Sequence, residues 1–268
     1  MAEKQRADVA LTQRGLAASR EKAQAAIMAG EVYSGLRRID KPSELIGPEE
    51  ELTVRAPAHP WVGRGGLKLE KAVEAFGADL TGRVCMDLGC ATGGFTDVCL
   101  QHGAAHVYAI DVGYGQFDWK LRQDPRVTLM ERTNARMLTP DMFPLHPTVA
   151  VMDVSFISIR LILPVAAGIL GPEGVFYTLI KPQFEAGRGK VGKHGVVRDP
   201  LVHQEVLGGI RDFCRGMDWR MVKLDFSPVT GPKGNIEFLA ELRPAAAAGE
   251  EVGDEAIRAC VRIAHERL

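Results

Sequence analysis

Four charged residues, far apart in the chain, are of the types that a proton-transfer site needs. Two are lysines, Lys68 and Lys181, and two are carboxylates, Asp153 and Glu237. A lysine can take a proton from a weakly acidic hydroxyl if burial or a neighbouring cation favours its neutral form, and carboxylates can orient the amines. We therefore predict that all four are catalytic, with Lys181 as the base and Lys68 as the neighbouring cation. A structural ion-pair network at the edge of a sheet is the alternative.

Strands and helices that could position these residues alternate after residue 65. Apolar runs that end in polar residues span residues 83–87, 106–111, 127–131, 148–153 and 174–181. This alternation predicts an α/β fold with a mainly parallel, doubly wound sheet. Such sheets bind ligands at the carboxyl ends of their strands, where Asp153 and Lys181 fall. Glu237 begins a late strand, and we expect it at the same rim.

A glycine-rich turn, DLGCATGGFT at residues 87–96, connects the first of these strands to a helix. Glycine lets the backbone pass close to a ligand, although the spacing differs from the dinucleotide fingerprint GxGxxG. The second strand ends at Asp111, whose carboxylate can accept hydrogen bonds from both ribose hydroxyls of an adenosine. These features predict a cofactor site, against the alternative of a simple tight turn. The predicted cofactor contacts are Asp87, Gly89, Ala91, Thr92, Gly93, Gly94, Asp111, Val112, Asn134 and Asp153.

Basic residues gather in two places, although the formal net charge of the chain is only -1. Residues 181–198 are rich in glycine and cations and contain a single acid, Glu185. Residues 1–58 resemble a small helix–helix–strand unit, with helices predicted near 6–14 and 19–28. Both regions suit a polyanion, because phosphates supply much of the affinity for nucleic acid; a solvated surface loop is the alternative for the first. The predicted RNA-binding residues are Arg6, Arg14, Arg20, Lys22, Arg37, Arg38, Lys41, Arg64, Arg188, Lys190 and Lys193.

Proline and glycine around residues 56–66 predict a linker over residues 59–65. The expected domains are then residues 1–58 and 66–243, followed by a tail, 244–268, with a short helix from about Asp254. The five cysteines show no CxxC pair and no zinc spacing, so no metal site is predicted. The sequence shows neither a signal-peptide core nor an apolar run of about 18 residues, which favours a cytoplasmic protein.

The motifs around the strand ends resemble those of the TlyA family of ribosomal RNA methyltransferases, whose members are often labelled hemolysin A. The similar segments are residues 83–96, 111–116, 131–136, 153–158 and 181–185. Residues 6–32 resemble the alpha-L type RNA-binding domain first seen in the fourth small-subunit ribosomal protein. The likeness continues to about Arg243.

This resemblance implies an FtsJ-like, Rossmann-like class I methyltransferase fold, preceded by a small α+β RNA-binding domain. It implies S-adenosylmethionine as methyl donor and a cytidine 2′-hydroxyl of ribosomal RNA as target. It also implies that the family's Lys-Asp-Lys-Glu tetrad falls on Lys68, Asp153, Lys181 and Glu237. The expected partner is ribosomal RNA or a ribosomal subunit, with no membrane and no obligate protein partner.

Two other classes of function remain open from the sequence. A membrane-active hemolysin would need an amphipathic or apolar membrane segment, which we do not find. A non-catalytic RNA-binding assembly factor would keep the fold but would have no use for a desolvated pair of lysines.

Overall fold

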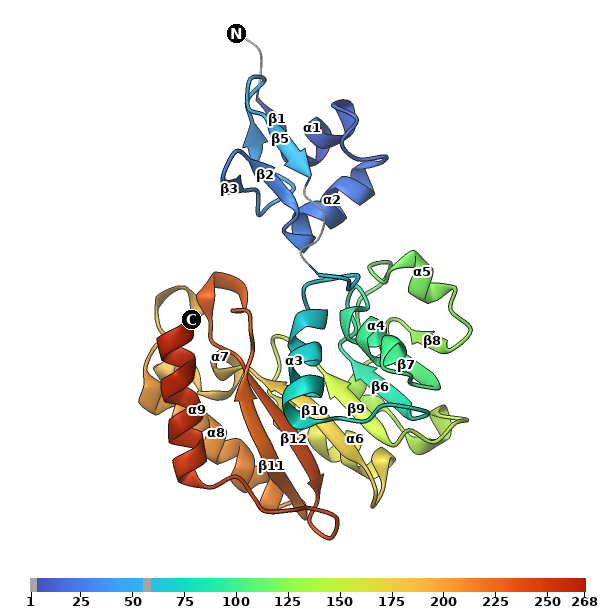
Figure 1. The fold of residues 1–268 in the computed structure, drawn as a ribbon, viewed down its shortest axis with the longest axis vertical. Helices are drawn as coiled ribbons and strands as arrows, with labels where there is room; N and C mark the ends of the chain where they lie inside the picture. Colours follow the sequence, from blue (N-terminus) through green and yellow to red (C-terminus); the bar gives the residue numbers. More distant parts are fainter. Residues whose placement is uncertain (1–3, 55–58) are drawn as a thin grey trace. The chain divides into compact units, whose positions relative to one another are not determined.

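The computed structural model describes residues 4–54 and 59–268, with the side chains of Ala29, Arg188 and Pro232 excepted. The chain divides into two compact units, Met1–Arg64 and Gly65–Leu268 (Figure 1). Residues 56–58, part of the segment from which a linker is predicted, lie outside the described residues. The linker itself, at residues 59–65, stays a prediction.

The first unit contains two helices beside short strands. The helices are α1 (Ala7–Gln13) and α2 (Arg20–Ala29), and Ser19 caps α2 by accepting the backbone N–H of Lys22. The strands are β1 (Gln5–Arg6), β2 (Val32–Ser34), β3 (Arg37–Arg38), β4 (Leu45–Ile46) and β5 (Leu52–Val54). They form an antiparallel β3-β2-β5 sheet and a separate β1-β4 pair. The two helices agree with the sequence prediction. The two-residue strands carry no periodic pattern that could reveal them.

A buried carboxylate holds the two helices of this unit together. Asp8 in α1 has no exposed surface. Its two oxygens accept hydrogen bonds from Arg6 at 2.9 and 3.0 Å, from Arg20 at 2.9 Å and from Gln24 at 2.8 Å. The hydrogen bonds from Arg6 are the main reason that the pKa of Asp8 lies well below its usual range. Two arginines predicted to bind RNA therefore also neutralise a buried acid.

We expect Asp8→Asn to destabilise the first unit by about 2 kcal/mol, because charge-assisted hydrogen bonds to a buried group are lost. The folded pKa lies below the unfolded value, so the contribution of Asp8 is complete above about pH 4 and is lost only at lower pH. Hydrogen exchange of the α1 and α2 amides at pH 7 should accelerate in Asp8→Asn. Asp40→Asn is the matched control, because Asp40 pairs with Arg38 at the surface. Equal exchange in the two variants would contradict the assignment.

The second unit is built on a seven-stranded sheet, counted among the described residues, with helices on both faces (Figure 1). The strand order is β11-β12-β10-β9-β6-β7-β8. The strands are β6 (Val84–Leu88), β7 (His106–Ile110), β8 (Val127–Met130), β9 (Val149–Met152), β10 (Val175–Ile180), β11 (Trp219–Phe226) and β12 (Phe238–Pro244). The first five are parallel, and β12 runs antiparallel to both β10 and β11. This confirms the predicted mainly parallel, doubly wound sheet.

Helices cover the sheet in two layers. They are α3 (Gly66–Phe76), α4 (Gly94–Gln101), α5 (Trp119–Arg122), α6 (Leu163–Leu170), α7 (Pro182–Glu185), α8 (Pro200–Arg215) and α9 (Asp254–Arg267). Short 3-10 turns lie between them: η1 (Ala135–Met137), η2 (Pro140–Met142), η3 (Ile159–Leu161), η4 (Arg188–Lys190), η5 (Lys193–Gly195) and η6 (Pro232–Gly234).

Neighbouring residues of a strand point to opposite faces, which explains the two layers. Phe176 of β10 belongs to a core that also contains buried side chains of α6, α8 and α9. Tyr177, the next residue, stacks on Phe76 of α3, with 6.5 Å between ring centroids. The helix predicted from Asp254 is α9. Its buried residues Ile257 and Val261 belong to the same core as Phe176.

Candidate active site

Three strand ends and one helix start meet at one rim of the sheet. Asp153 follows β9 and Lys181 follows β10, and these two strands are parallel neighbours. Because β12 is antiparallel to β10, its beginning lies at the same rim, and Glu237 immediately precedes it. Lys68 lies in the first turn of α3. The fold therefore brings the four predicted catalytic residues together.

These four side chains form a continuous ion-pair network with Asp153 at its centre. Lys68 Nζ lies 3.0 Å from Asp153 Oδ2, and Lys181 Nζ lies 2.5 Å from Asp153 Oδ1. Lys68 also donates to Glu237 Oε2 at 2.7 Å, and Lys181 donates to Ser155 Oγ at 2.8 Å. Both lysines are nearly buried and Glu237 is fully buried. Ser155 lies in the segment 153–158 that resembles the TlyA family, but the sequence analysis predicted no role for it.

Charge and burial act in opposite directions on this network. Burial by itself lowers the pKa of Lys68, but the charges of Asp153 and Glu237 outweigh it and raise the pKa above its ordinary value. Burial likewise raises the pKa of Asp153, yet the charges of Lys68 and Lys181 outweigh it and lower the pKa. At neutral pH Lys68 is therefore a cation and Asp153 an anion.

The buried position of Glu237 requires a glycine opposite it. A Cβ built on Gly231 would overlap the Glu237 carboxylate, so a larger residue there would displace it. The backbone N–H of Ser227, after β11, donates to the Glu237 carbonyl oxygen at 2.8 Å. Glu237 is thus held through its backbone as well as through its side chain.

The glycine-rich turn after β6 lies beside Asp153. Gly89 has a φ of +85°, a region that favours glycine, and a Cβ there would approach the Asp153 carbonyl oxygen to 3.0 Å. The Asp111 carboxylate accepts the backbone N–H groups of Ala91 at 2.8 Å and Gly113 at 2.7 Å. Each carboxylate oxygen has a second lone pair, so Asp111 shapes the turn and can still accept from a ligand.

The other residues predicted to bind a cofactor lie in this turn or after the ends of β7 and β8. Thr92 is exposed and precedes Gly93 and Gly94, where α4 begins. Val112 is 70% exposed beside Asp111. Asn134 caps η1 after the end of β8.

A small cavity beside Asp111 is lined also by Tyr114 and Glu131, neither of which was predicted. Tyr114 is exposed, and the guanidinium of Arg132 lies 4.3 Å from its ring centroid. Tyr114 lies within the segment 111–116 that resembles the TlyA family, so its position was marked although its role was not.

Asp87, at the start of the turn, is a fully buried carboxylate. Its Oδ2 accepts a hydrogen bond from Thr96 at 2.7 Å, whereas Oδ1 has no partner among the described residues. Burial raises the pKa of Asp87 to about 7. The carboxylate is therefore suited to a cationic or hydrogen-bond-donating ligand group.

We expect Asp87→Asn to stabilise the ligand-free chain at pH 8. The folded pKa exceeds the unfolded value near 4, so the stability of the native chain falls as the pH rises from about 4 to 7. Asparagine removes this penalty, and the melting temperature at pH 8 should rise by roughly 5 °C, with little change at pH 4. Asp141→Asn, at an exposed position, is the control. A lower melting temperature for Asp87→Asn at pH 8 would refute the assignment.

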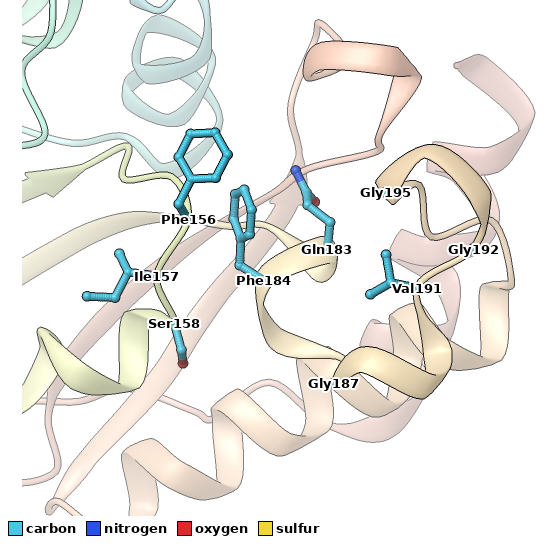
Figure 2. Close-up of a pocket in the computed structure, with 9 residues that line it drawn as sticks. All are labelled: Phe156, Ile157, Ser158, Gln183, Phe184, Gly187, Val191, Gly192 and Gly195. Carbon is cyan, nitrogen blue, oxygen red and sulfur yellow. The ribbon is translucent and has the colours of Figure 1, made fainter.

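An open pocket of about 510 Å³ lies between the loop after β9 and the segment after β10 (Figure 2). Phe156 is 92% exposed and has a φ of +66°, a strained conformation for a side chain of this size. Its ring lies 5.4 Å from that of Phe184, centroid to centroid. The buried amide oxygen of Gln183 has no partner among the described residues. Phe156, Gln183 and Phe184 lie in segments that resemble the TlyA family, but no role was predicted for them, because strain and exposure are properties of the fold.

The predicted RNA-binding residues differ in how far their charge is already compensated. Arg14 donates to backbone carbonyls of residues 47 and 50. Arg37 pairs with Glu44 and Glu50, Arg38 pairs with Asp40, and Lys190 pairs with Glu205. Arg188 lies outside the residues whose side chains are described. Among the predicted RNA-binding residues, Lys22, Lys41 and Lys193 are exposed, and no ion pair is found for them within the described parts of the chain.

Comparisons with known proteins agree with this architecture. Residues 61–243 match the model of the FtsJ-like methyltransferases, and residues 5–52 match that of the S4 domain. The chain is 51% identical over 268 residues to YqxC of Bacillus subtilis, whose name assigns it provisionally to the rRNA methyltransferases; the match covers 99% of this chain and 95% of YqxC. It is 44% identical to the 16S/23S rRNA (cytidine-2'-O)-methyltransferase TlyA of Mycobacterium tuberculosis, over 91% of each chain.

A solved structure from Streptococcus thermophilus, whose name carries the word hemolysin, superposes with a TM-score of 0.79 at 43% identity. The match covers 100% of this chain and 98% of that one. Among the described residues, no helix has the length and apolar character needed to cross a membrane.

Fold and domain matches together define an S4-domain methyltransferase. The chain belongs to the TlyA family of FtsJ-like methyltransferases.

Proposed function

We propose that this enzyme transfers a methyl group from S-adenosylmethionine to the 2′-hydroxyl of a cytidine in ribosomal RNA. The observation that carries the proposal is the network in which Asp153 joins Lys68 to Lys181 beside the glycine-rich turn. The TlyA relative, whose printed name gives the cytidine 2′-O reaction on 16S and 23S rRNA, supplies the target. A cytoplasmic location and action on RNA or a ribosomal subunit, without an obligate protein partner, complete the proposal.

The residues around the turn fit S-adenosylmethionine. Asp111 has free acceptor capacity for ribose hydroxyls, and Val112 offers an exposed apolar surface for an adenine ring. The unpartnered oxygen of Asp87 suits a group that carries an ammonium. When bound, S-adenosylmethionine supplies a methyl group activated by a sulfonium. Because Gly89 has no side chain, the backbone of the turn lies close to the Asp153 carbonyl oxygen.

In the proposed mechanism, Lys181 accepts the proton of the ribose 2′-hydroxyl, and the hydroxyl oxygen gains the nucleophilic character that methyl transfer needs. Asp153 holds the Lys181 amine in place, assisted by Ser155. Lys68 remains a cation on the opposite oxygen of Asp153. Its positive charge compensates part of the negative charge of Asp153.

We expect Lys181→Arg to bind RNA and S-adenosylmethionine normally but to transfer methyl groups on the order of a hundredfold more slowly. Arginine keeps the charge but cannot release its proton near neutral pH, so the general base is lost. The measurement is single-turnover transfer of labelled methyl groups to ribosomal subunits, with binding of both substrates determined separately. Lys120→Arg, at an exposed position in α5, is the control. A near wild-type rate for Lys181→Arg would show that another group is the base.

The first unit is proposed to bind the RNA backbone. Its S4 domain match and its surface cations support this role. Lys22 and Lys41 are the clearest candidates, because their charge is not shared with a neighbouring acid in the described residues. Beside the active site, the exposed ring of Phe156 offers a face on which an unpaired base can stack.

Replacing Lys22 and Lys41 together with alanine should weaken RNA binding, make its salt dependence shallower by about two units and leave cofactor binding unchanged. Affinity for ribosomal RNA measured over a range of salt concentrations tests this. Arg6 and Arg20 are unsuitable for the same test, since their loss would uncover the buried Asp8. Arg262→Ala in α9, whose partner Glu266 is on the same helix, is the control. An unchanged salt slope in the double variant would exclude these lysines as phosphate contacts.

A further inference from the structure

Lys71 lies one helical turn after Lys68 in α3 and is not part of the tetrad. Its Nζ donates to Asp225 Oδ1 at 3.1 Å and to the Phe226 carbonyl oxygen at 2.6 Å. The same amine lies 3.6 Å from the centroid of the Phe226 ring, within the range of a cation–π contact. One ammonium thus makes three contacts with the last two residues of β11, and only about a quarter of the Lys71 side chain is exposed.

The start of α3 has little of its own to fix it. Gly65, the N-cap residue, has no side chain to accept a hydrogen bond, and the first turn contains no acid. Lys68 lies in that turn, where the helix dipole disfavours a cation. The position of the Lys68 amine therefore depends on contacts outside the helix.

Lys71 supplies such a contact at the strand pair that holds Glu237. Phe226 of β11 lies opposite Phe238 of β12, directly after Glu237. The next residue, Ser227, donates its backbone N–H to the Glu237 carbonyl oxygen. Lys71 and Lys68 thus attach α3 at two adjacent points, one to the end of β11 and the other to the carboxylate before β12.

We propose that Lys71 is a positioning residue for methyl transfer: by anchoring α3 to Asp225 and Phe226, it places the Lys68 amine between Asp153 and Glu237. The inference rests on the proposed function of Lys68 as the cation of the site. The alternative is that Lys71 only stabilises the packing of α3 on the sheet.

Lys223 provides a matched control for that alternative. It too is a lysine that joins α3 to β11, because it donates to the Phe76 carbonyl oxygen at the opposite end of the helix and pairs with Glu241. Phe76 lies eight residues beyond Lys68, about 12 Å along the helix. A change there alters packing without altering the first turn.

The test is a double-mutant cycle on the full chain, with single-turnover methyl transfer to ribosomal subunits at saturating S-adenosylmethionine. Lys71→Met should reduce the rate about tenfold, because small displacements of a catalytic group have large effects on rate. Affinity for S-adenosylmethionine should stay unchanged, and Lys71→Arg should restore part of the rate. In a Lys68→Ala background, Lys71→Met should change the rate by less than about twofold. Lys223→Met should keep the wild-type rate even where it lowers the melting temperature.

A full tenfold effect of Lys71→Met in the Lys68→Ala background would overturn the proposal, as would a wild-type rate for Lys71→Met alone. If Lys68→Ala itself transfers at the wild-type rate, the role of the tetrad in the proposed function fails instead. Should Lys71→Met not fold, Asp225→Asn enters the same cycle. Asp225→Asn keeps the hydrogen bond from Lys71 to the Phe226 carbonyl oxygen, so we expect a smaller loss of rate. This loss should disappear in the Lys68→Ala background. An equal loss of rate in both backgrounds would again contradict the proposal.

Discussion

The Asp153 carboxylate is the group on which the rest of the candidate active site depends. Its two oxygens contact the side-chain nitrogens of Lys68 and Lys181, at 3.0 and 2.5 Å, and only 18% of its side chain is exposed. In such a place an uncompensated charge is expensive, so each lysine needs the acid and the acid needs both lysines. Asp153 follows β9, Lys181 follows β10, and Lys68 is on α3. The charge of Asp153 is therefore compensated only when β9, β10 and α3 are correctly packed together.

The glycine-rich turn contains a buried carboxylate, that of Asp87. Asp87 is buried with an unpartnered oxygen, and its pKa is raised to about 7 by that burial. A structure selected only for stability would not keep a carboxylate there. Functional sites often retain groups that lower the stability of the free protein, because a ligand supplies the missing partner. Asp111, by contrast, is well satisfied by two backbone N–H groups and gives the turn its shape.

Much of this arrangement could be predicted from the sequence, because it follows from local pattern and topology. Apolar runs placed Asp153 and Lys181 at strand ends, and parallel strands then bring such ends to one rim. Partnerships made only in the folded chain could not be predicted in this way. Asp8 and Arg20 are near in sequence, yet their residue types do not indicate that they form an ion pair. Lys71 and Asp225 are 154 residues apart, and the exposure and positive φ of Phe156 arise only from the fold.

We propose that the network around Asp153 activates a ribose hydroxyl. The most direct test is to digest RNA that the purified enzyme has methylated with labelled S-adenosylmethionine and to separate the nucleosides by mass spectrometry. We expect the label in cytidine, on the 2′-oxygen of the ribose. Label on a nucleobase, or no transfer to ribosomal RNA in any state of assembly, would contradict it.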